Sequence, residues 1–124
     1  MEKEDYLETI YNLKKEKNYI RISDIAETLG LSKPSVTQMM QRLKKEGLVD
    51  YEPYKPLKLT ARGNKIGRGV ADRHQVLSEF FTLLGVSNDI QKKDIHGIEH
   101  YLSPVSFKKL KKVTLFLSGN NYKG

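Results

Sequence analysis

The sequence contains no cysteine, only three histidines, and no hydrophobic run that approaches the length of a membrane span. Without cysteine it forms neither disulfides nor thiolate metal sites, so any metal ligands must be nitrogen or oxygen atoms. A membrane-spanning helix needs about 20 consecutive apolar residues, and the sequence therefore argues against that class of protein. Because the first residues are mostly charged, we expect no secretory signal and a cytoplasmic location.

Negative charge is also in short supply. Lysine and arginine together number 22 against 15 aspartates and glutamates, which gives a formal net charge of +7 at pH 7. A basic surface attracts polyanions, and with no membrane-spanning run the natural polyanion is nucleic acid. A basic protein without such a partner would carry the same charge. The length of 124 residues suits one compact domain, or a small domain with a dimerising extension.

The first half of the sequence has the pattern of a winged helix-turn-helix. Apolar residues at helical spacing predict a helix over residues 3–16. A second helix opens near Ser23 and ends at Gly30, and a third is capped by Ser32 and stopped by Gly47. The linking segment TLGLSKPS is typical of a helix-turn-helix. The segment LVDYEPYKPLKLT then predicts two short strands around prolines, which resemble a wing.

The third predicted helix has one apolar side and a wide polar side. The apolar side consists of Val36, Met39, Met40 and Leu43, while long amides and cations occupy the rest. Such side chains suit base edges and phosphates, although an ordinary solvent-exposed face would look similar. The candidate DNA-binding residues are Ser32, Lys33, Ser35, Thr37, Gln38, Gln41, Arg42 and Lys45 of the helix, with Lys55 and Lys58 of the wing.

The second half predicts three further helices. A long one runs from Thr60 to Gly85, with a basic first part and an apolar second part; another runs from about Asn88 to Leu102, and the last starts at Ser103. These helices carry more apolar surface than they can bury among themselves, so we expect dimerisation through them. The candidate contact residues are Leu77, Phe80, Phe81, Leu84, Ile98 and Leu102.

All three histidines fall where they could share one metal ion. His96, Glu99 and His100 have i, i+3, i+4 spacing and so lie on one side of a helix. Mixed nitrogen and oxygen ligands suit Mn, Fe, Co or Zn better than Ca or Mg. From the residues alone, ordinary exposed or core histidines remain an alternative. The candidate ligands are Asp5, Glu8, His74, His96, Glu99 and His100.

The string His96-Gly97-Ile98-Glu99-His100 also spells H-x-x-E-H, the motif of the inverted zinc peptidases, in which two histidines hold zinc and the glutamate activates water. A peptidase would need a third ligand further along the chain. Residues 103–124 contain no His, Cys, Asp or Glu, which argues against this enzyme.

Several motifs in the same order resemble those of one known family. They are EDYLETIY, RISDIAETLGLSKPSVTQMMQRLKKEGLV, LTARGNKIG, RHQVL and GIEHYLS, which together cover nearly the whole chain. The sequence resembles the metal-dependent repressors of the diphtheria-toxin-repressor type, and most closely their manganese transport regulator branch. The resemblance implies a winged helix that reads DNA, helices that dimerise, and a divalent metal whose binding favours the DNA-binding state.

The resemblance also assigns ligands, with one departure. Asp5, Glu8, His74, Glu99 and His100 each match a metal-binding position of the manganese branch. At His96 the manganese regulators usually have glutamate, and the iron-responsive branch has cysteine. An imidazole there shifts the expected preference towards Fe, Co, Ni or Zn. Ser78 stands where the iron-type members have a glutamate of a second site, so that site is poorly supported.

The resulting expectation is a mainly α protein: a winged helix-turn-helix DNA-binding domain over 1–62 and a helical metal-binding and dimerisation domain over 63–124, without the SH3-like third domain of longer members. We expect a homodimer on a palindromic double-stranded operator, with no membrane and no small-molecule substrate as partner. The resemblance implies repression of metal-uptake genes with a divalent transition metal, Mn(II) or Fe(II) first and Zn, Co or Ni as alternatives. A metal-independent winged-helix transcription factor is the other reading.

Overall fold

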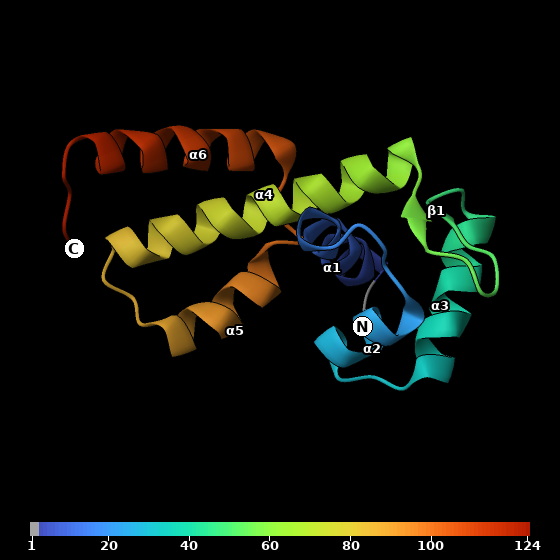
Figure 1. Ribbon diagram of the computed structural model, residues 1–124. Coiled ribbons are helices and arrows are strands. Elements are labelled where there is room, and N and C mark those ends of the chain that lie inside the picture. The colour runs from blue at the N-terminus through green and yellow to red at the C-terminus, as the bar shows by residue number, and fades with distance from the viewer. Residues whose placement is uncertain (1–2) are drawn as a thin grey trace. The chain divides into compact units, whose positions relative to one another are not determined.

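The computed structural model describes residues 3–124, which form six α-helices and one two-stranded antiparallel sheet. They pack as two compact units, one ending at Ala71 and the other starting at Asp72. The long helix α4 (Ala61–Leu83) belongs to both, because the division falls within it (Figure 1). The predicted boundary after residue 62 divides the chain by function and stays a prediction.

The first unit contains the predicted winged helix-turn-helix. Its elements before α4 are α1 (Lys3–Glu16), α2 (Ile22–Leu29), α3 (Lys33–Lys45), β1 (Val49–Asp50) and β2 (Lys58–Leu59). The strands pair antiparallel, with Val49 opposite Leu59. In Figure 1 a short loop joins α2 to α3, and the hairpin lies beside α3. The predicted fold class is therefore confirmed, including the two-stranded wing.

The core of this unit holds α3 by its apolar side. Ile10 of α1 and Ile25 of α2 are fully buried together with Val36, Met40 and Leu43 of α3. These last three residues belong to the predicted apolar side, and its fourth member, Met39, is partly buried against the same core. Because this side faces the core, the remaining sides of α3 are available to solvent and to a partner.

The ends of α2 and α3 are set by local hydrogen bonds. Ser32 caps α3 as predicted and accepts a hydrogen bond from the Ser35 amide at 3.3 Å. The start of α2 differs: the helix begins at Ile22, and the Asp24 carboxylate accepts from the Arg21 amide at 2.9 Å. Asp24 also accepts from Lys17, and this hydrogen bond is the main reason that its pKa lies below its usual range. This stabilisation is present at neutral pH and is lost in acid as the carboxylate protonates.

The beginning of α4 holds the end of α3. The Thr60 hydroxyl donates to the carbonyl of Gly47 at 2.7 Å, and its amide donates to that of Leu48 at 3.1 Å. The Arg62 guanidinium donates to the carbonyl of Glu46 at 3.2 Å. These bonds satisfy carbonyls of the three residues that follow α3 and tie that segment to the start of α4.

The second unit consists of the rest of α4 with α5 (Asn88–Ile98) and α6 (Pro104–Gly119). In Figure 1, α6 lies along α4, where Lys111 pairs with Asp72 at 3.4 Å. The buried Gln91 amide donates to Thr82 and to the carbonyl of Val86, which ties α5 to the turn before it. One prediction is wrong here, because α5 ends at Ile98 instead of near Leu102.

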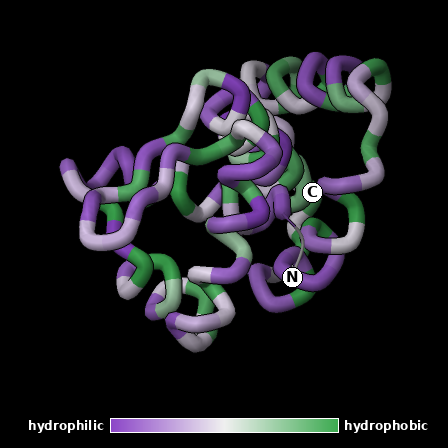
Figure 2. The backbone as a smooth tube through the Cα atoms, turned by 90° about the vertical axis from the view of Figure 1, so that its right-hand side faces the viewer, coloured by the Kyte–Doolittle hydropathy of each residue, from purple (hydrophilic) through white to green (hydrophobic). Residues whose placement is uncertain are grey.

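No helix among residues 3–124 is long and apolar enough to cross a membrane. Figure 2 shows the reason, since hydrophobic stretches along the tube are short and alternate with hydrophilic ones.

Candidate metal centre and nucleic-acid interface

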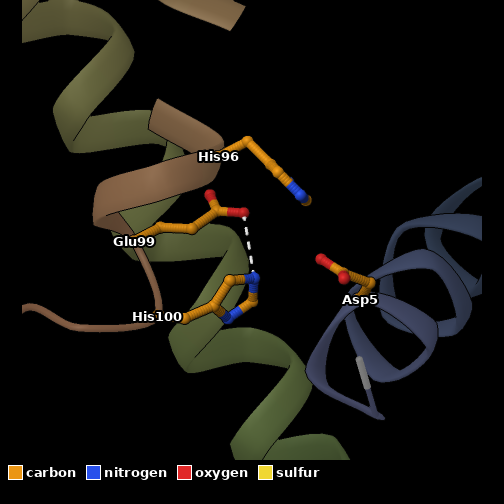
Figure 3. A group of neighbouring side chains, drawn as sticks. All are labelled: Asp5, His96, Glu99 and His100. Atoms are coloured by element: carbon orange, nitrogen blue, oxygen red, sulfur yellow. Dashed lines mark ion pairs between the residues drawn. The ribbon is translucent and has the colours of Figure 1, made fainter. Parts of the chain in front are cut away.

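The second unit gathers three candidate metal ligands at the end of α5. His96 lies in the last turns of the helix, whereas Glu99 and His100 lie in the turn that follows it. Each offers a ligand atom, and these atoms lie within 4.8 Å of one another. Figure 3 shows the three side chains projecting to the same side of this segment. The i, i+3, i+4 spacing thus brings them together, although only His96 is inside the α-helix.

Glu99 is the centre of this group. Its side chain is only 3% exposed, and its two carboxylate oxygens face different imidazoles. His74 Nδ1 from α4 lies 3.0 Å from Oε2, and His100 Nε2 lies 3.5 Å from Oε1. A buried carboxylate requires a positive partner, which is either a protonated ring or a bound cation. The donor set therefore fits a divalent transition metal, since imidazole and carboxylate are ligands for Mn, Fe, Co and Zn.

The two remaining candidate ligands belong to the first unit. Asp5 and Glu8 lie on α1, one helical turn apart, and both are partly buried. Figure 3 also draws Asp5 on that helix. The position of α1 in its own unit is tightly defined, because a Cβ atom on Gly67 of α4 would lie 2.5 Å from the carbonyl oxygen of Leu7. These carboxylates are thus held by close helix packing.

The predicted DNA-binding residues lie on the outer sides of α3 and the wing. Thr37 is half-buried, and all the others are exposed: Ser32, Lys33, Ser35, Gln38, Gln41, Arg42, Lys45, Lys55 and Lys58. Lys55 is already paired with Glu52 at 2.9 Å, and this hydrogen bond raises the Lys55 pKa. Its charge at the wing is therefore partly compensated.

A cleft of about 550 Å³ lies between the wing and the starts of α2 and α3, and the sequence did not indicate it. Its basic and aromatic lining includes Arg21, Lys33, Lys55 and Tyr54. Tyr54 is fully exposed and adopts a left-handed backbone with φ of 65°, which non-glycine residues rarely do. The sequence analysis took this tyrosine only as a residue that favours strands. An aromatic residue next to Lys55 in a turn between strands was the signal that could have indicated a binding surface there.

The second unit also exposes apolar side chains. Of the predicted dimer residues, Leu84 and Ile98 are exposed, Phe80, Phe81 and Leu102 are half-buried, and Leu77 is buried in the core. Further exposed apolar residues occur on α5 and α6, which the prediction did not include. They are Ile90, Val105, Val113, Leu115 and Phe116.

A winged helix followed by a helical unit that gathers imidazole and carboxylate ligands defines a metal-dependent, DNA-binding transcriptional regulator. Residues 1–57 match the family model described as "Iron dependent repressor, N-terminal DNA binding domain", and residues 60–123 match "Iron dependent repressor, metal binding and dimerisation domain". The chain belongs to this iron-dependent repressor family. The family consists of transcriptional regulators, so the chain is not an enzyme and the peptidase reading of H-x-x-E-H is wrong.

Individual relatives agree with the family. The chain is 50% identical over 100 residues to the HTH-type transcriptional regulator MntR of Shouchella clausii. The matched segment covers 81% of this chain and 70% of that protein. The MntR of Bacillus subtilis is 47% identical to this chain, and the match again covers 81% of this chain and 70% of that protein. The solved structure of the manganese regulator SloR superposes with a TM-score of 0.76 at 29% identity, covering 90% of this chain. The chain spans about half of that solved chain, 52% of its length.

Proposed function

We propose that the chain is a repressor activated by Mn(II) or Fe(II), with Asp5, Glu8, His74, His96, Glu99 and His100 as the metal ligands. One observation carries this proposal: the buried Glu99 carboxylate lies between the rings of His74 and His100. Two kinds of relative support the choice of metal: those at about half identity are named MntR, and SloR, whose solved chain is 29% identical, is named a manganese regulator. Bound there, a divalent ion would supply positive charge to the buried Glu99 carboxylate.

The proposed ligands divide between the two units, and this division gives the mechanism. Asp5 and Glu8 are on α1, whose Leu7 and Ile10 belong to the core of the winged helix. The other ligands are on α4 and α5 in the second unit. Ligands that share one ion must hold a fixed distance, so the winged helix takes one position relative to the dimerisation unit. Metal then favours DNA binding because it binds that arrangement more tightly than the others.

Operator affinity measured with and without metal separates this proposal from a metal-independent transcription factor. A duplex selected from a random library serves as operator, and fluorescence anisotropy follows its binding by the full chain. We expect affinity to rise as Mn²⁺ or Fe²⁺ is added and to fall again with a chelator, with Co²⁺ and Zn²⁺ tested in parallel. An affinity that is the same with metal and with chelator would contradict the proposal and favour the alternative.

We further propose that α3 reads bases and that the wing holds the backbone. Ser35, Thr37, Gln38 and Gln41 face base edges, whereas Lys33, Arg42, Lys45, Lys55 and Lys58 face phosphates. The cleft beside the wing, with Arg21 and Tyr54, extends this surface between α3 and the hairpin. A dimer would place two such surfaces about 34 Å apart, one turn of DNA, which predicts a palindromic operator. The cytoplasm is the expected site of action.

Gln41→Ala and Lys45→Ala should affect DNA binding in different ways. A glutamine that makes a bidentate contact with adenine contributes about 1 to 3 kcal/mol of discrimination, so Gln41→Ala should relax sequence preference. Lys45→Ala should weaken all sequences alike and reduce the slope of log affinity against log salt by about 1. Selection from a random library and salt titrations measure both, with Lys109→Ala on α6 as a control. Equal loss of specific and non-specific binding in Gln41→Ala would remove it from base readout.

Homodimerisation should run through the second unit. Exposed Ile98 of α5 and Val113 and Phe116 of α6 are apolar side chains that another subunit could cover. Ile98→Glu should therefore shift the protein towards monomer. The matched control is Asn12→Glu at an exposed position of α1, because its neighbour Leu13 is half-buried against the core. Sedimentation measures the mass at micromolar concentration. A monomeric unsubstituted chain, with or without metal, would contradict the expected dimer.

A further inference from the structure

The main chain of Glu99 is held by a side chain from α4. Arg73 Nε donates a hydrogen bond to the carbonyl oxygen of Glu99 at 2.9 Å. The next residue, His74, approaches the carboxylate of the same glutamate at 3.0 Å. Two consecutive residues of α4 thus contact the backbone and the side chain of one proposed ligand.

Backbone hydrogen bonds connect the segment held by Arg73 to α5: the Glu99 amide donates to the carbonyl of Ile95 at 2.9 Å, and the Leu102 amide donates to that of Ile98 at 3.1 Å. The α-helix ends at Ile98, so Glu99 and His100 lie in a turn. Gly97 occupies the last helical turn, and glycine favours the helical state less than any residue except proline. The last carbonyls of a helix have no partner within it, and a cation that donates to one stabilises that end. Arg73 adds to these bonds a contact from α4, made at the carbonyl of Glu99 itself.

We propose that Arg73 is a positioning residue of the metal site, which holds the end of α5 so that Glu99 and His100 keep the spacing that a divalent ion requires. This inference rests on the proposed function, because it takes those residues as ligands. Arg73 itself binds no metal, since a guanidinium has no acceptor atom.

Two effects of Arg73 on metal affinity have opposite signs. Its positive charge repels a dication, so removing it would strengthen binding. Its hydrogen bond orders the ligands, so removing it would weaken binding. Groups that orient metal ligands typically change affinity by about 10- to 100-fold. Repulsion between partly solvated charges is smaller because water screens it. We therefore expect positioning to dominate.

Arg73→Met removes the donor and keeps a long side chain. The Mn²⁺ affinity of the full-length variant should fall about tenfold, as measured from the electron paramagnetic resonance signal of free Mn²⁺. Arg73→Lys keeps a donor and a charge, and should recover part of the loss. Arg68→Met, on an exposed arginine of the same helix, should leave the affinity unchanged.

A second substitution separates positioning from a general loss of stability. A Cβ atom added to Gly97 would have nothing within 4 Å, so alanine fits there. Because alanine favours the helix, Gly97→Ala in the Arg73→Met background should restore Mn²⁺ affinity about three- to fivefold. A purely structural role of Arg73 would instead lower the thermal stability of the metal-free protein without changing its Mn²⁺ affinity.

Unchanged or tighter Mn²⁺ binding in folded Arg73→Met would overturn this inference and leave the proposed metal site intact. If circular dichroism shows that Arg73→Met does not fold, Arg73→Gln carries the same expected loss of affinity. A failure of the unsubstituted chain to bind Mn²⁺ at all would overturn the site itself, and this inference with it.

Discussion

Glu99→Gln should abolish the activation of DNA binding by metal. The substitution keeps the size of the side chain and its ability to accept a hydrogen bond from His74, but it removes the negative charge. Because Glu99 lies between two of the other proposed ligands, no other carboxylate of the second unit can replace it. We expect metal affinity to fall by roughly 100-fold or more, beyond the effect of residues that only orient ligands. Operator affinity should then stay at its metal-free level.

Two measurements separate this loss from unfolding. Removing a buried charge relieves its desolvation, so metal-free Glu99→Gln should melt at the same temperature as the unsubstituted chain or higher. Glu79→Gln makes the same chemical change at an exposed position of α4 and should keep the full response to metal. A Glu99→Gln variant whose operator binding still rises with Mn²⁺ would show that Glu99 is not a ligand.

The winged helix could be predicted because its signals are local. Ser32 caps α3, Gly47 has a positive φ after it, and the buried stripe of Val36, Met40 and Leu43 repeats at helical spacing. Each signal acts within a few residues, so the sequence displays it directly. The cap of α2 was not predicted: Arg21 is the N-cap, its amide donates to the Asp24 carboxylate, and Lys17, seven positions before Asp24, donates to the same carboxylate.

The candidate metal site was predictable in its residue types but not in its geometry. The spacing of His96, Glu99 and His100 indicated a shared direction, and that prediction needed only the helical period. The end of α5 at Ile98 was not visible in the sequence, nor was the hydrogen bond just beyond it, where the carbonyl of Glu99 accepts from an arginine 26 residues earlier. His74 meets Glu99 across a similar separation, through the packing of α4 against α5. No sequence periodicity encodes contacts of this kind.

Surfaces formed by several elements were the least predictable. The cleft beside the wing combines Arg21, Lys33 and Tyr54, which come from three different segments. The buried Leu77 was predicted as a dimer contact because apolar residues of core and interface look alike in a sequence. Burial separates them only when the helices that cover each residue are known.

His96 is the proposed ligand at which we expect the chain to differ from the manganese branch. It is exposed, and its ring centre lies 6.0 Å from that of His100, edge-on at 89°. A ring nitrogen of His96 lies within 4.8 Å of a ligand atom of Glu99, so it can join the same ion. Imidazole strengthens binding of the later first-row metals, whereas a carboxylate suits the harder Mn²⁺. This residue should therefore set the choice of metal.

His96→Glu should raise the ratio of Mn²⁺ to Zn²⁺ affinity by about tenfold, equivalent to roughly 1.4 kcal/mol. His96→Ala should instead weaken all metals, because one ligand is lost. Competition titrations with Mn²⁺, Fe²⁺ and Zn²⁺ measure these ratios. Asn88→Glu adds the same carboxylate at the other, exposed end of α5 and should leave them unchanged. If His96 points into solvent, both of its variants will keep the relative affinities of the unsubstituted chain, and the metal site then consists of the other five residues.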